Sequence, residues 1–415
     1  MTMAAQLSRP RIHFTARSGW INDPHGLSVV GNRYHLFFQH VPGSTVWQPN
    51  CHWGHAVSDN LVDWEQQPIA LAPGDGDDGV WSGSITRGDQ GEALAFYTSV
   101  QVPDFSIGRV RVARPTDPAW TRWEKGDAVV ELPQELDAVA FRDPFVFRDD
   151  GGWRMLVGTA LQGHVAAAAS FSSPDRLTWT YDGIAASRPS SETDPVWTGS
   201  LWECPQLFEV DGQHVLVTSV WDEDVLNYVV YAVGSYEDGL FQARQWHRLT
   251  YGDSYYAPSF FRDRDGQPCL IFWLRGPIDK EAGWAGAHSI PYRLSVADGR
   301  LVMRLHPEIL SYMETLTPDQ SGHGPILVRW QPTDDDIQVF TGPTPVTRLH
   351  RTDSGIEVTT KAGPVLLPDV GNTTACLLLD GPILELCCGT SNFAMSADAD
   401  LSARMGHNPV TGATA

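Results

Sequence analysis

A strand-like apolar run recurs at near-constant spacing along most of this 415-residue chain. The runs begin at Tyr34, Leu94, Trp153, His214 and Cys269, which are 55 to 61 residues apart. About ten residues ahead of each run lies a second short apolar segment, and a turn rich in Gly and Asp separates the two. These second segments are Gly26–Val29, Gly83–Ile85, Phe145–Phe147, Gln206–Phe208 and Ser259–Phe261. Two strands joined by such a turn form a β-hairpin.

Five hairpin units at this spacing, with almost no amphipathic helical stretch among them, predict an all-β fold and specifically a five-bladed β-propeller. The alternative is an irregular β-sandwich whose strands happen to recur. We refer to the units as repeats one to five, in chain order.

The pattern changes at about Glu314, where a polar connector runs from Thr315 to Gly322. The runs that follow no longer keep the sixty-residue spacing: 326–328, 337–340, 355–358, 375–379, 383–386 and 393–395. Several short alternating strands within about a hundred residues predict a small antiparallel β-sandwich. We therefore expect a propeller domain over residues 1–313 and a short sandwich domain over 323–415, with the chain from Gly406 onward untethered.

Three carboxylates lie one or two residues before a proline in the segments that lead into these strands. Asp23 stands in Trp-Ile-Asn-Asp-Pro-His-Gly, Asp143 in Phe-Arg-Asp-Pro, and Glu203 in Trp-Glu-Cys-Pro. A charged residue at the start of a buried strand is costly unless something pairs or uses it. In a propeller the innermost strands line one channel, so matching positions of successive repeats converge. The repeat spacing thus predicts that the three acids meet, whereas unrelated turn acids before proline would have no reason to share it.

Sugar cleavage is one chemistry that uses such acids. Two carboxyl groups that flank a glycosidic bond act as acid and nucleophile when about 5 to 5.5 Å apart, or as acid and base when roughly 6.5 to 9.5 Å apart. The tryptophan and cysteine beside Glu203 give it an apolar setting that suits a proton donor. The Asn22 amide can hold Asp23 or a sugar hydroxyl, and we expect Arg142 to keep Asp143 ionised.

The composition narrows the binding partners. The net charge of -21, from 29 basic and 50 acidic residues, argues against nucleic acid and anionic membranes. Sixteen tryptophans, several beside the acidic motifs, could stack on sugar rings or simply pack the core. His52 and His55 are three apart, which places them on opposite faces of a strand, so we expect neither a metal nor a cofactor.

The absence of an apolar leader segment in residues 1–13, and of any run of 18 apolar residues, leads us to expect a cytoplasmic protein with no membrane span. The six cysteines form no CxxC pair, which fits reduced thiols in such a compartment.

The three acidic motifs, in this order and with these separations, make the chain resemble glycoside hydrolase family 32, the invertases, inulinases and levanases. The segments 36–39, 53–56, 81–84 and 256–260 are similar to that family as well. The resemblance implies a five-bladed propeller joined to a β-sandwich, and retaining hydrolysis of β-fructofuranosides without a metal. It implies that Asp23 is the nucleophile, Glu203 the general acid/base and Asp143 the transition-state stabiliser. The residues implied to line the fructosyl subsite are Asn22, Gln39, Trp47, Ser82, Arg142, Tyr256 and Trp273.

His25 stands where that family most often has Asn, and we expect it on the rim of the site. The function predicted is hydrolysis of terminal β-D-fructofuranosyl residues of sucrose or short fructo-oligosaccharides, with the fructoside as the only required partner and a homo-oligomer compatible with the sequence. A fructosyltransferase that uses the same site, an inverting hydrolase of arabinan or xylan type and a sugar-binding propeller without turnover are the alternatives.

Overall fold

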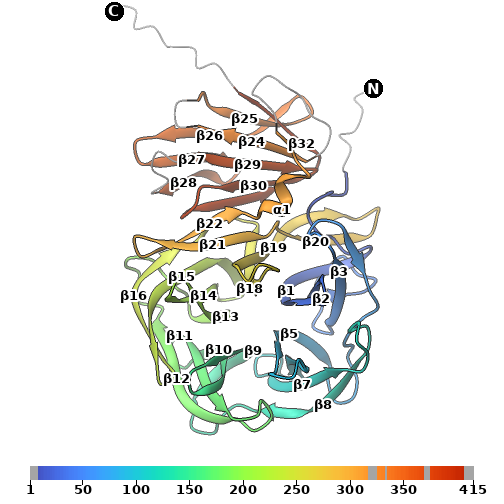
Figure 1. Cartoon of the computed structure of the whole chain (residues 1–415). Coiled ribbons are helices and arrows are strands. Elements are labelled where there is room, and N and C mark those ends of the chain that lie inside the picture. The colour runs from blue at the N-terminus through green and yellow to red at the C-terminus, as the bar shows by residue number, and fades with distance from the viewer. Residues whose placement is uncertain (1–7, 316–324, 332–333, 369–373, 406–415) are drawn as a thin grey trace, which may run out of the picture.

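The computed structural model describes residues 8–315, 325–331, 334–368 and 374–405. Nearly all regular structure in these ranges is β-strand, and the one α-helix among them is the single turn α1 (Pro307–Leu310). Figure 1 shows the strands of the five repeats in successive sheets around a common centre, with the C-terminal strands stacked on one side. In the described ranges no helix is long and apolar enough to cross a membrane. Most of the predicted connector and the segment from Gly406 onward lie outside those ranges.

Repeats two, three and four each form a four-stranded sheet of consecutive antiparallel strands. Repeat two contains β5 (Gly79–Arg87), β6 (Ala93–Val100), β7 (Arg109–Pro115) and β8 (Trp123–Val130). Repeat three contains β9 (Ala138–Asp149), β10 (Gly152–Leu161), β11 (Val165–Ser173) and β12 (Thr180–Pro189). Repeat four contains β13 (Leu201–Val210), β14 (Gln213–Asp222), β15 (Val225–Glu237) and β16 (Leu240–Arg248).

Repeats one and five share one nine-stranded sheet. Repeat one contains β1 (Gly19–Val30), β2 (Arg33–Val41), β3 (His52–Ser58) and β4 (Trp64–Gln66). Repeat five contains β18 (Tyr255–Arg262), β19 (Pro268–Asp279), β20 (Trp284–His288), β21 (Tyr292–Ala297) and β22 (Arg300–Leu305). The two are joined because β20 runs parallel to β1 and pairs with it at two positions, Gly19 with Trp284 and Trp20 with Ala285.

The five predicted hairpins are confirmed. In each repeat the two predicted segments are neighbouring antiparallel strands: β1 with β2, β5 with β6, β9 with β10, β13 with β14, and β18 with β19. The first strands also contact one another in a closed series, from β1 through β5, β9, β13 and β18 back to β1. Residues on these five strands are therefore brought to a common centre (Figure 1).

The C-terminal region consists of two sheets. One contains β17 (Thr250–Gly252), β23 (Glu314–Thr315), β24 (Ile326–Trp330), β29 (Ala375–Asp380), β30 (Ile383–Cys387) and β31 (Asn392–Ser396). The other contains β25 (Ile337–Thr341), β26 (Thr344–Thr352), β27 (Gly355–Thr360), β28 (Gly363–Pro368) and β32 (Leu401–Met405). The six runs predicted here are all strands, and β26, β28 and β32 were not predicted. One apolar cluster holds residues of both sheets, such as Trp330 and Leu377 from the first and Val339 and Val358 from the second.

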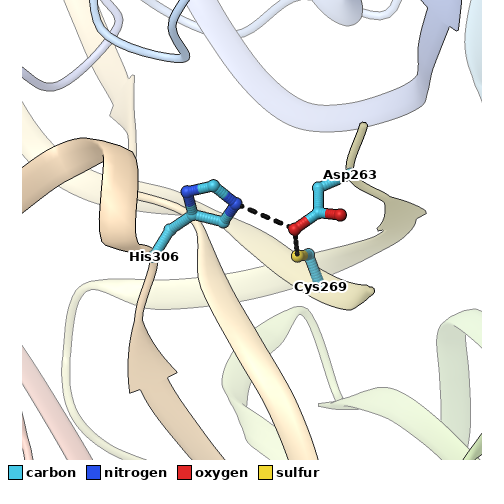
Figure 2. A group of neighbouring side chains, drawn as sticks. All are labelled: Asp263, Cys269 and His306. Atoms are coloured by element: carbon cyan, nitrogen blue, oxygen red, sulfur yellow. Dashed lines mark hydrogen bonds and ion pairs between the residues drawn. The ribbon is translucent and has the colours of Figure 1, made fainter. Parts of the chain in front are cut away.

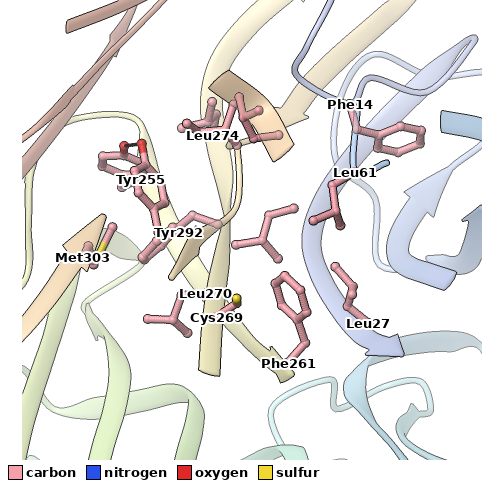
Figure 3. Packing of buried hydrophobic residues seen from close by; sticks show 14 of the residues in the cluster. Phe14, Leu27, Leu61, Tyr255, Phe261, Cys269, Leu270, Leu274, Tyr292 and Met303 are labelled. Carbon is pink, nitrogen blue, oxygen red and sulfur yellow. Dashed lines mark hydrogen bonds between the residues drawn. The ribbon is translucent and has the colours of Figure 1, made fainter. Parts of the chain in front are cut away.

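A second apolar cluster joins the repeats to the C-terminal sheets. Figure 3 shows part of it, with Phe14 ahead of repeat one, Leu27 in β1, and Tyr255 and Tyr292 in repeat five. The same cluster includes Leu378 of β29. Because burial of apolar area is the main favourable contribution to folding, this shared core ties the two ends of the described chain to each other.

Candidate active site

The three acids do not lie at the starts of strands, as the sequence predicted, but inside them. Asp23, Asp143 and Glu203 lie within β1, β9 and β13, at points where the pairing with the second strand shifts register. Pro144 and Pro205 lie inside these shifts and Pro24 at the end of one. Because proline has no N–H to donate, an irregular position suits it better than a regular ladder. Such bulges re-aim side chains, and the register prediction failed because apolar periodicity does not reveal them.

The bulges also define which residues of successive repeats correspond. Asp143 and Cys204 each precede the proline and adopt positive φ angles of 65° and 49°, which non-glycine residues seldom occupy. Glu203 therefore corresponds in position to Arg142, and Asp143 corresponds to Cys204. Ala257 in β18 has the same feature, with a φ of 44°. The same local distortion thus recurs in repeats three, four and five.

Asp23 accepts hydrogen bonds through both carboxylate oxygens. Asn22 Nδ2 donates to Oδ1 at 3.1 Å, and Gln39 Nε2 and Ser82 Oγ donate to Oδ2 at 3.1 and 2.7 Å. Burial, followed by the charge of Glu203, raises the pKa of Asp23 to about 6, while the Ser82 and Asn22 hydrogen bonds act in the opposite direction. Asp23 is therefore ionised at neutral pH, and its orientation is fixed from two repeats.

Glu203 is held by a cation and a phenol. Arg142 Nε and Nη2 donate to Oε1 at 3.0 and 2.8 Å, and the Tyr256 hydroxyl donates to Oε2 at 2.6 Å. Arg142, Glu203 and Tyr256 occupy corresponding positions in repeats three, four and five, which explains why they meet. Two donors on one carboxyl oxygen and a third on the other fix the orientation of this group, so the triad is a rigid part of the site.

Asp143 is buried at 5% exposure, and its Oδ2 accepts the backbone N–H of Cys204 at 3.0 Å. The charge of Arg142 lowers the pKa of Asp143, as expected, but it does not keep the carboxyl group fully ionised. Arg142 donates to Glu203 instead, and burial, followed by the charge of Glu203, raises the pKa of Asp143 to about 7. Neighbouring carboxylates in a desolvated site cannot all be ionised cheaply, so this group of acids still holds a proton near neutral pH.

The three acids line one cavity of about 780 Å³. Of the seven residues predicted to bind substrate, six line the same cavity: Asn22, Gln39, Trp47, Arg142, Tyr256 and Trp273. The seventh, Ser82, lies just outside the lining and reaches the site through its hydrogen bond to Asp23. Trp273 Nε1 is buried and has no hydrogen-bond partner, so it is a donor available to a ligand in the cavity.

Sequence reasoning missed several residues that line the cavity. They include Phe105, Trp221, Leu226, Glu223 and Asp224, whereas Trp20 and Trp81 in the lining are among the tryptophans expected beside the motifs. Trp221 lies at the end of β14, and an aromatic residue at the end of a predicted second strand is a signal that could have found it. Phe105 lies in the loop between β6 and β7, and no strand pattern identifies such a position.

His25 was predicted on the rim, and that prediction is wrong. Its side chain is 3% exposed, is absent from the cavity lining and packs against Trp53 with ring centroids 4.1 Å apart. The residue follows Pro24 and therefore lies beyond the bulge, where β1 resumes pairing with β2 at Phe37. Its side chain consequently points into the interior of repeat one.

One group in the described ranges brings three potential metal ligands together. Figure 2 shows Asp263, Cys269 and His306 converging, with His306 Nε2 3.1 Å from Asp263 Oδ2. The same oxygen accepts Arg293 Nε at 2.7 Å. Burial raises the pKa of the Cys269 thiol, which disfavours the thiolate a metal would need. Because a guanidinium already neutralises the carboxylate, this cluster is a structural link between β19, β21 and α1.

A cavity that gathers carboxylates, amides and aromatic rings on an all-β scaffold is typical of proteins that bind sugars. The chain belongs to glycosyl hydrolase family 32, because the profile for the family's N-terminal domain matches residues 13–306.

Among its relatives is the sucrose-6-phosphate hydrolase of Escherichia coli, 32% identical over 71% of this chain and 64% of that protein. A fructan 6-exohydrolase of Beta vulgaris is 31% identical over 68% of this chain and 51% of that protein. The match thus spans between half and two thirds of these relatives. A solved Bombyx mori GH32 β-fructofuranosidase superimposes with a TM-score of 0.79 over 96% of this chain and 91% of that one, at 24% identity.

Proposed function

We propose that this protein hydrolyses terminal β-D-fructofuranosyl residues of sucrose or short fructo-oligosaccharides, with retention of configuration. The observation that carries the proposal is the convergence of Asp23, Asp143 and Glu203 in one aromatic-lined cavity. Membership of family 32 supports it, since the named relatives are hydrolases of sucrose 6-phosphate and fructan. No metal or cofactor is needed for this chemistry.

Asp23 is the nucleophile in this mechanism. Its ionised carboxylate, oriented by Asn22, Gln39 and Ser82, attacks the anomeric carbon of the fructosyl residue. Glu203 takes up the proton that this group of acids retains and gives it to the departing oxygen. As a carboxylate it then accepts a proton from the water that attacks the fructosyl-enzyme and releases fructose. Tyr256 and Arg142 orient Glu203 for both steps.

Asp143 stabilises the transition state. The Cys204 N–H fixes one of its oxygens, which leaves the other for a fructosyl hydroxyl. Trp273 Nε1 is a second group available to a hydroxyl, and Trp47, Asn22 and the groups that hold the acids complete the subsite. Hydrogen bonds that strengthen as charge develops on the sugar ring lower the barrier more than those that bind substrate equally well throughout.

The charge of the cavity favours a substrate without phosphate. Five carboxylates line it, from Asp23, Asp143, Glu203, Glu223 and Asp224, whereas its cationic lining is Arg142 and, when protonated, His164. Arg142 is already paired with Glu203. A phosphate on the leaving sugar would meet net negative charge, so we expect kcat/KM to be higher for sucrose than for sucrose 6-phosphate.

The finer architecture is part of this proposal. We take the five repeats as five blades of a β-propeller over residues 1–313, and the two C-terminal sheets as a β-sandwich domain over 323–415. The closed series of contacts among the five first strands supports the first assignment. The apolar cluster shared by the two C-terminal sheets supports the second.

A substrate panel with product chromatography tests the function. We expect free fructose from sucrose or short fructo-oligosaccharides, loss of turnover by a factor on the order of 10⁴ or more in Asp23→Asn, and sugar binding retained in that variant.

Longer oligosaccharides formed from concentrated sucrose would instead indicate a fructosyltransferase. An inverted first product by NMR would contradict the mechanism. If the wild-type protein binds these sugars, including sucrose 6-phosphate, but cleaves none of them, the protein is a sugar-binding module without turnover.

A further inference from the structure

The nucleophile segment of β1 leaves its own sheet. In the pairing with β2, Ile21 is opposite His40 and the next paired residue is Pro24, so Asn22 and Asp23 have no partner in that ladder. The parallel pairing with β20 stops at Trp20. Because buried backbone groups need hydrogen bonds, the carbonyl and N–H groups of this segment must find other partners.

A histidine from repeat five supplies one of them. Nε2 of His288, the last residue of β20, lies 2.8 Å from the Asn22 carbonyl oxygen. A carbonyl oxygen can only accept, so Nε2 carries the hydrogen. The ring is fully buried, and burial lowers the pKa of His288 to about 4. It is therefore neutral at physiological pH, with Nδ1 unprotonated and, as the structure shows, without a partner.

The position of this ring is fixed by its surroundings. Its centroid lies 5.5 Å from that of Phe14 and 5.8 Å from that of Phe38, and the His288 backbone N–H donates to the Phe14 carbonyl at 2.9 Å. The pKa of the buried His25 lies well below the usual histidine range, chiefly through burial and secondly because a protonated His288 would repel a protonated His25. His288 is thus a rigid donor in an apolar setting.

A second histidine makes the same kind of contact two residues earlier. His40 Nδ1, on β2, lies 2.8 Å from the carbonyl oxygen of Trp20. The Trp20–Ile21 and Asn22–Asp23 peptide groups are therefore each fixed by an imidazole, the first from repeat one and the second from repeat five. Asn22 leads directly to Asp23, and its side chain also donates to the Asp23 carboxylate.

We propose that His288 is a positioning residue for Asp23. Its hydrogen bond fixes the Asn22 peptide, and this in turn sets the direction of the Asn22 amide and of the Asp23 carboxylate. The inference rests on the proposed function in so far as Asp23 is the nucleophile. It also gives β20 a second role, because the strand that joins repeat five to repeat one then orients the reacting group.

The test compares His288→Leu, which removes the donor, with His288→Gln, whose side-chain amide can replace it. In His288→Leu we expect kcat to fall by about ten- to a hundredfold with KM changed by less than about threefold, because misplacement of a reacting group costs that much. The acid limb of kcat/KM should move to higher pH, because the Asn22 amide lowers the pKa of Asp23. In His288→Gln we expect kcat and the position of the acid limb to return most of the way to the wild-type values.

His35→Leu is the matched control. Like His288, His35 is a buried histidine, and it lies on β2 of repeat one. Its ring pairs with His55 and has no described contact with Asn22 or Asp23. We expect this variant to lose stability while it keeps the wild-type kcat and acid limb. The proposal would be overturned if His288→Leu kept the wild-type kcat and the wild-type acid limb of kcat/KM. It would also be overturned if His35→Leu showed the same fall in kcat and the same shift of the acid limb as His288→Leu.

A measurement without substrate separates this proposal from the proposed function. Carboxyl ¹³C NMR follows the titration of Asp23 directly, and ¹⁵N NMR of the histidines reports the tautomer of His288. We expect the Nε2–H tautomer in the wild type and a higher Asp23 pKa in His288→Leu than in the wild type. The opposite tautomer, or an unchanged Asp23 titration, overturns the inference even if no fructoside is cleaved.

Discussion

At the scale of single residues, the site is a set of carboxylates whose protonation is controlled by their hydrogen-bond donors. Asp143 is buried and Asp23 half-buried beside Glu203, and desolvation raises the pKa of Asp23 to about 6 and that of Asp143 to about 7. Asp23 has four side-chain donors, from Asn22, Gln39, Ser82 and, at 3.7 Å, the Cys204 thiol. The carboxylate of Asp143 accepts the backbone N–H of Cys204. Burial and the charge of Glu203 raise both pKa values, and the donors to Asp23 act in the opposite direction, toward its ionised form.

Ser82→Ala should move the acid limb of the pH profile. The Ser82 hydroxyl donates to ionised Asp23, so its removal disfavours the carboxylate and raises the Asp23 pKa above about 6. Activity that needs ionised Asp23 is then lost at a higher pH, and we expect the acid limb of kcat/KM to rise by about one pH unit. Ser84→Ala is the control, because Ser84 is also buried in β5 but contacts Pro144 and Val146 instead. Equal profiles for the two variants would contradict the assignment.

Tyr256→Phe should reduce turnover. The variant removes the hydroxyl that donates to Glu203 at 2.6 Å, and a hydrogen bond to a charged group contributes about 1.5 to 3 kcal/mol. We expect kcat/KM to fall by about ten- to a hundredfold in steady-state assays. The adjacent Tyr255→Phe serves as the control, since the Tyr255 hydroxyl pairs with Tyr292 away from the cavity. It should change the melting temperature more than the turnover.

At the scale of secondary-structure elements, the bulges in the first strands decide the geometry. The strands and their hairpins could be predicted from sequence, because apolar periodicity and Gly/Asp turns are local signals. The bulges could not, since nothing local distinguishes Asp143 at positive φ from an ordinary residue before proline. This is why the contacts of Glu203 with Arg142 and Tyr256 were not recognised from the sequence as a triad.

Gly286→Ala should disturb the contact between β20 and β1. A Cβ at this position would lie 2.1 Å from the Ile21 carbonyl oxygen, and the glycine has a φ of 82°. We expect a loss of about 2 to 4 kcal/mol in the free energy of unfolding, together with reduced kcat because the nucleophile segment shifts. Gly283→Ala controls for backbone strain, because its φ is 74° while its Cβ would meet nothing within 4 Å. If urea unfolding gives the same loss for both, close approach of the strands is not the cause.

At the scale of the whole molecule, a buried ion cluster joins the two ends of the described chain. His13 Nδ1 lies 2.8 Å from Asp380 Oδ2, and His13 Nε2 lies 2.9 Å from Glu385 Oε2, with all three side chains almost completely buried. Asp380 also accepts the backbone N–H groups of Arg11, Ile12 and His13. The segment ahead of repeat one is thereby fixed to β29 and β30.

This cluster predicts loss of stability at high pH. Burial by itself lowers the pKa of His13, but Glu385 and Asp380 outweigh it and raise the pKa from 6.5 to about 9. A group whose pKa is higher in the folded state stabilises fully below its unfolded pKa, here about 6.5, and its contribution is lost as pH rises through 9. The difference between the folded and unfolded pKa of His13 corresponds to about 3 kcal/mol in the free energy of unfolding.

Urea unfolding at pH 6.5, 8 and 9.5 measures this contribution. The wild type should lose stability across the range, and His13→Gln should be less stable at pH 6.5 but with a flatter pH dependence. His214 is a partly exposed histidine on β14, and His214→Gln should leave the dependence of the free energy of unfolding on pH unchanged. A wild-type slope in His13→Gln would show that another group carries the pH dependence.

The sequence by itself determined the β-strands, the five hairpin repeats and the motifs that hold the acids, because these depend on local periodicity and turn chemistry. Its prediction that the three acids meet followed from repeat spacing and is confirmed by the cavity they share. Tertiary structure decided which groups pair within that cavity, the burial of His25, the joining of β20 to β1 and the attachment of His13 to the C-terminal sheet. These depend on backbone distortions and on contacts between segments far apart in the chain, and neither leaves a periodic signal in the amino-acid sequence.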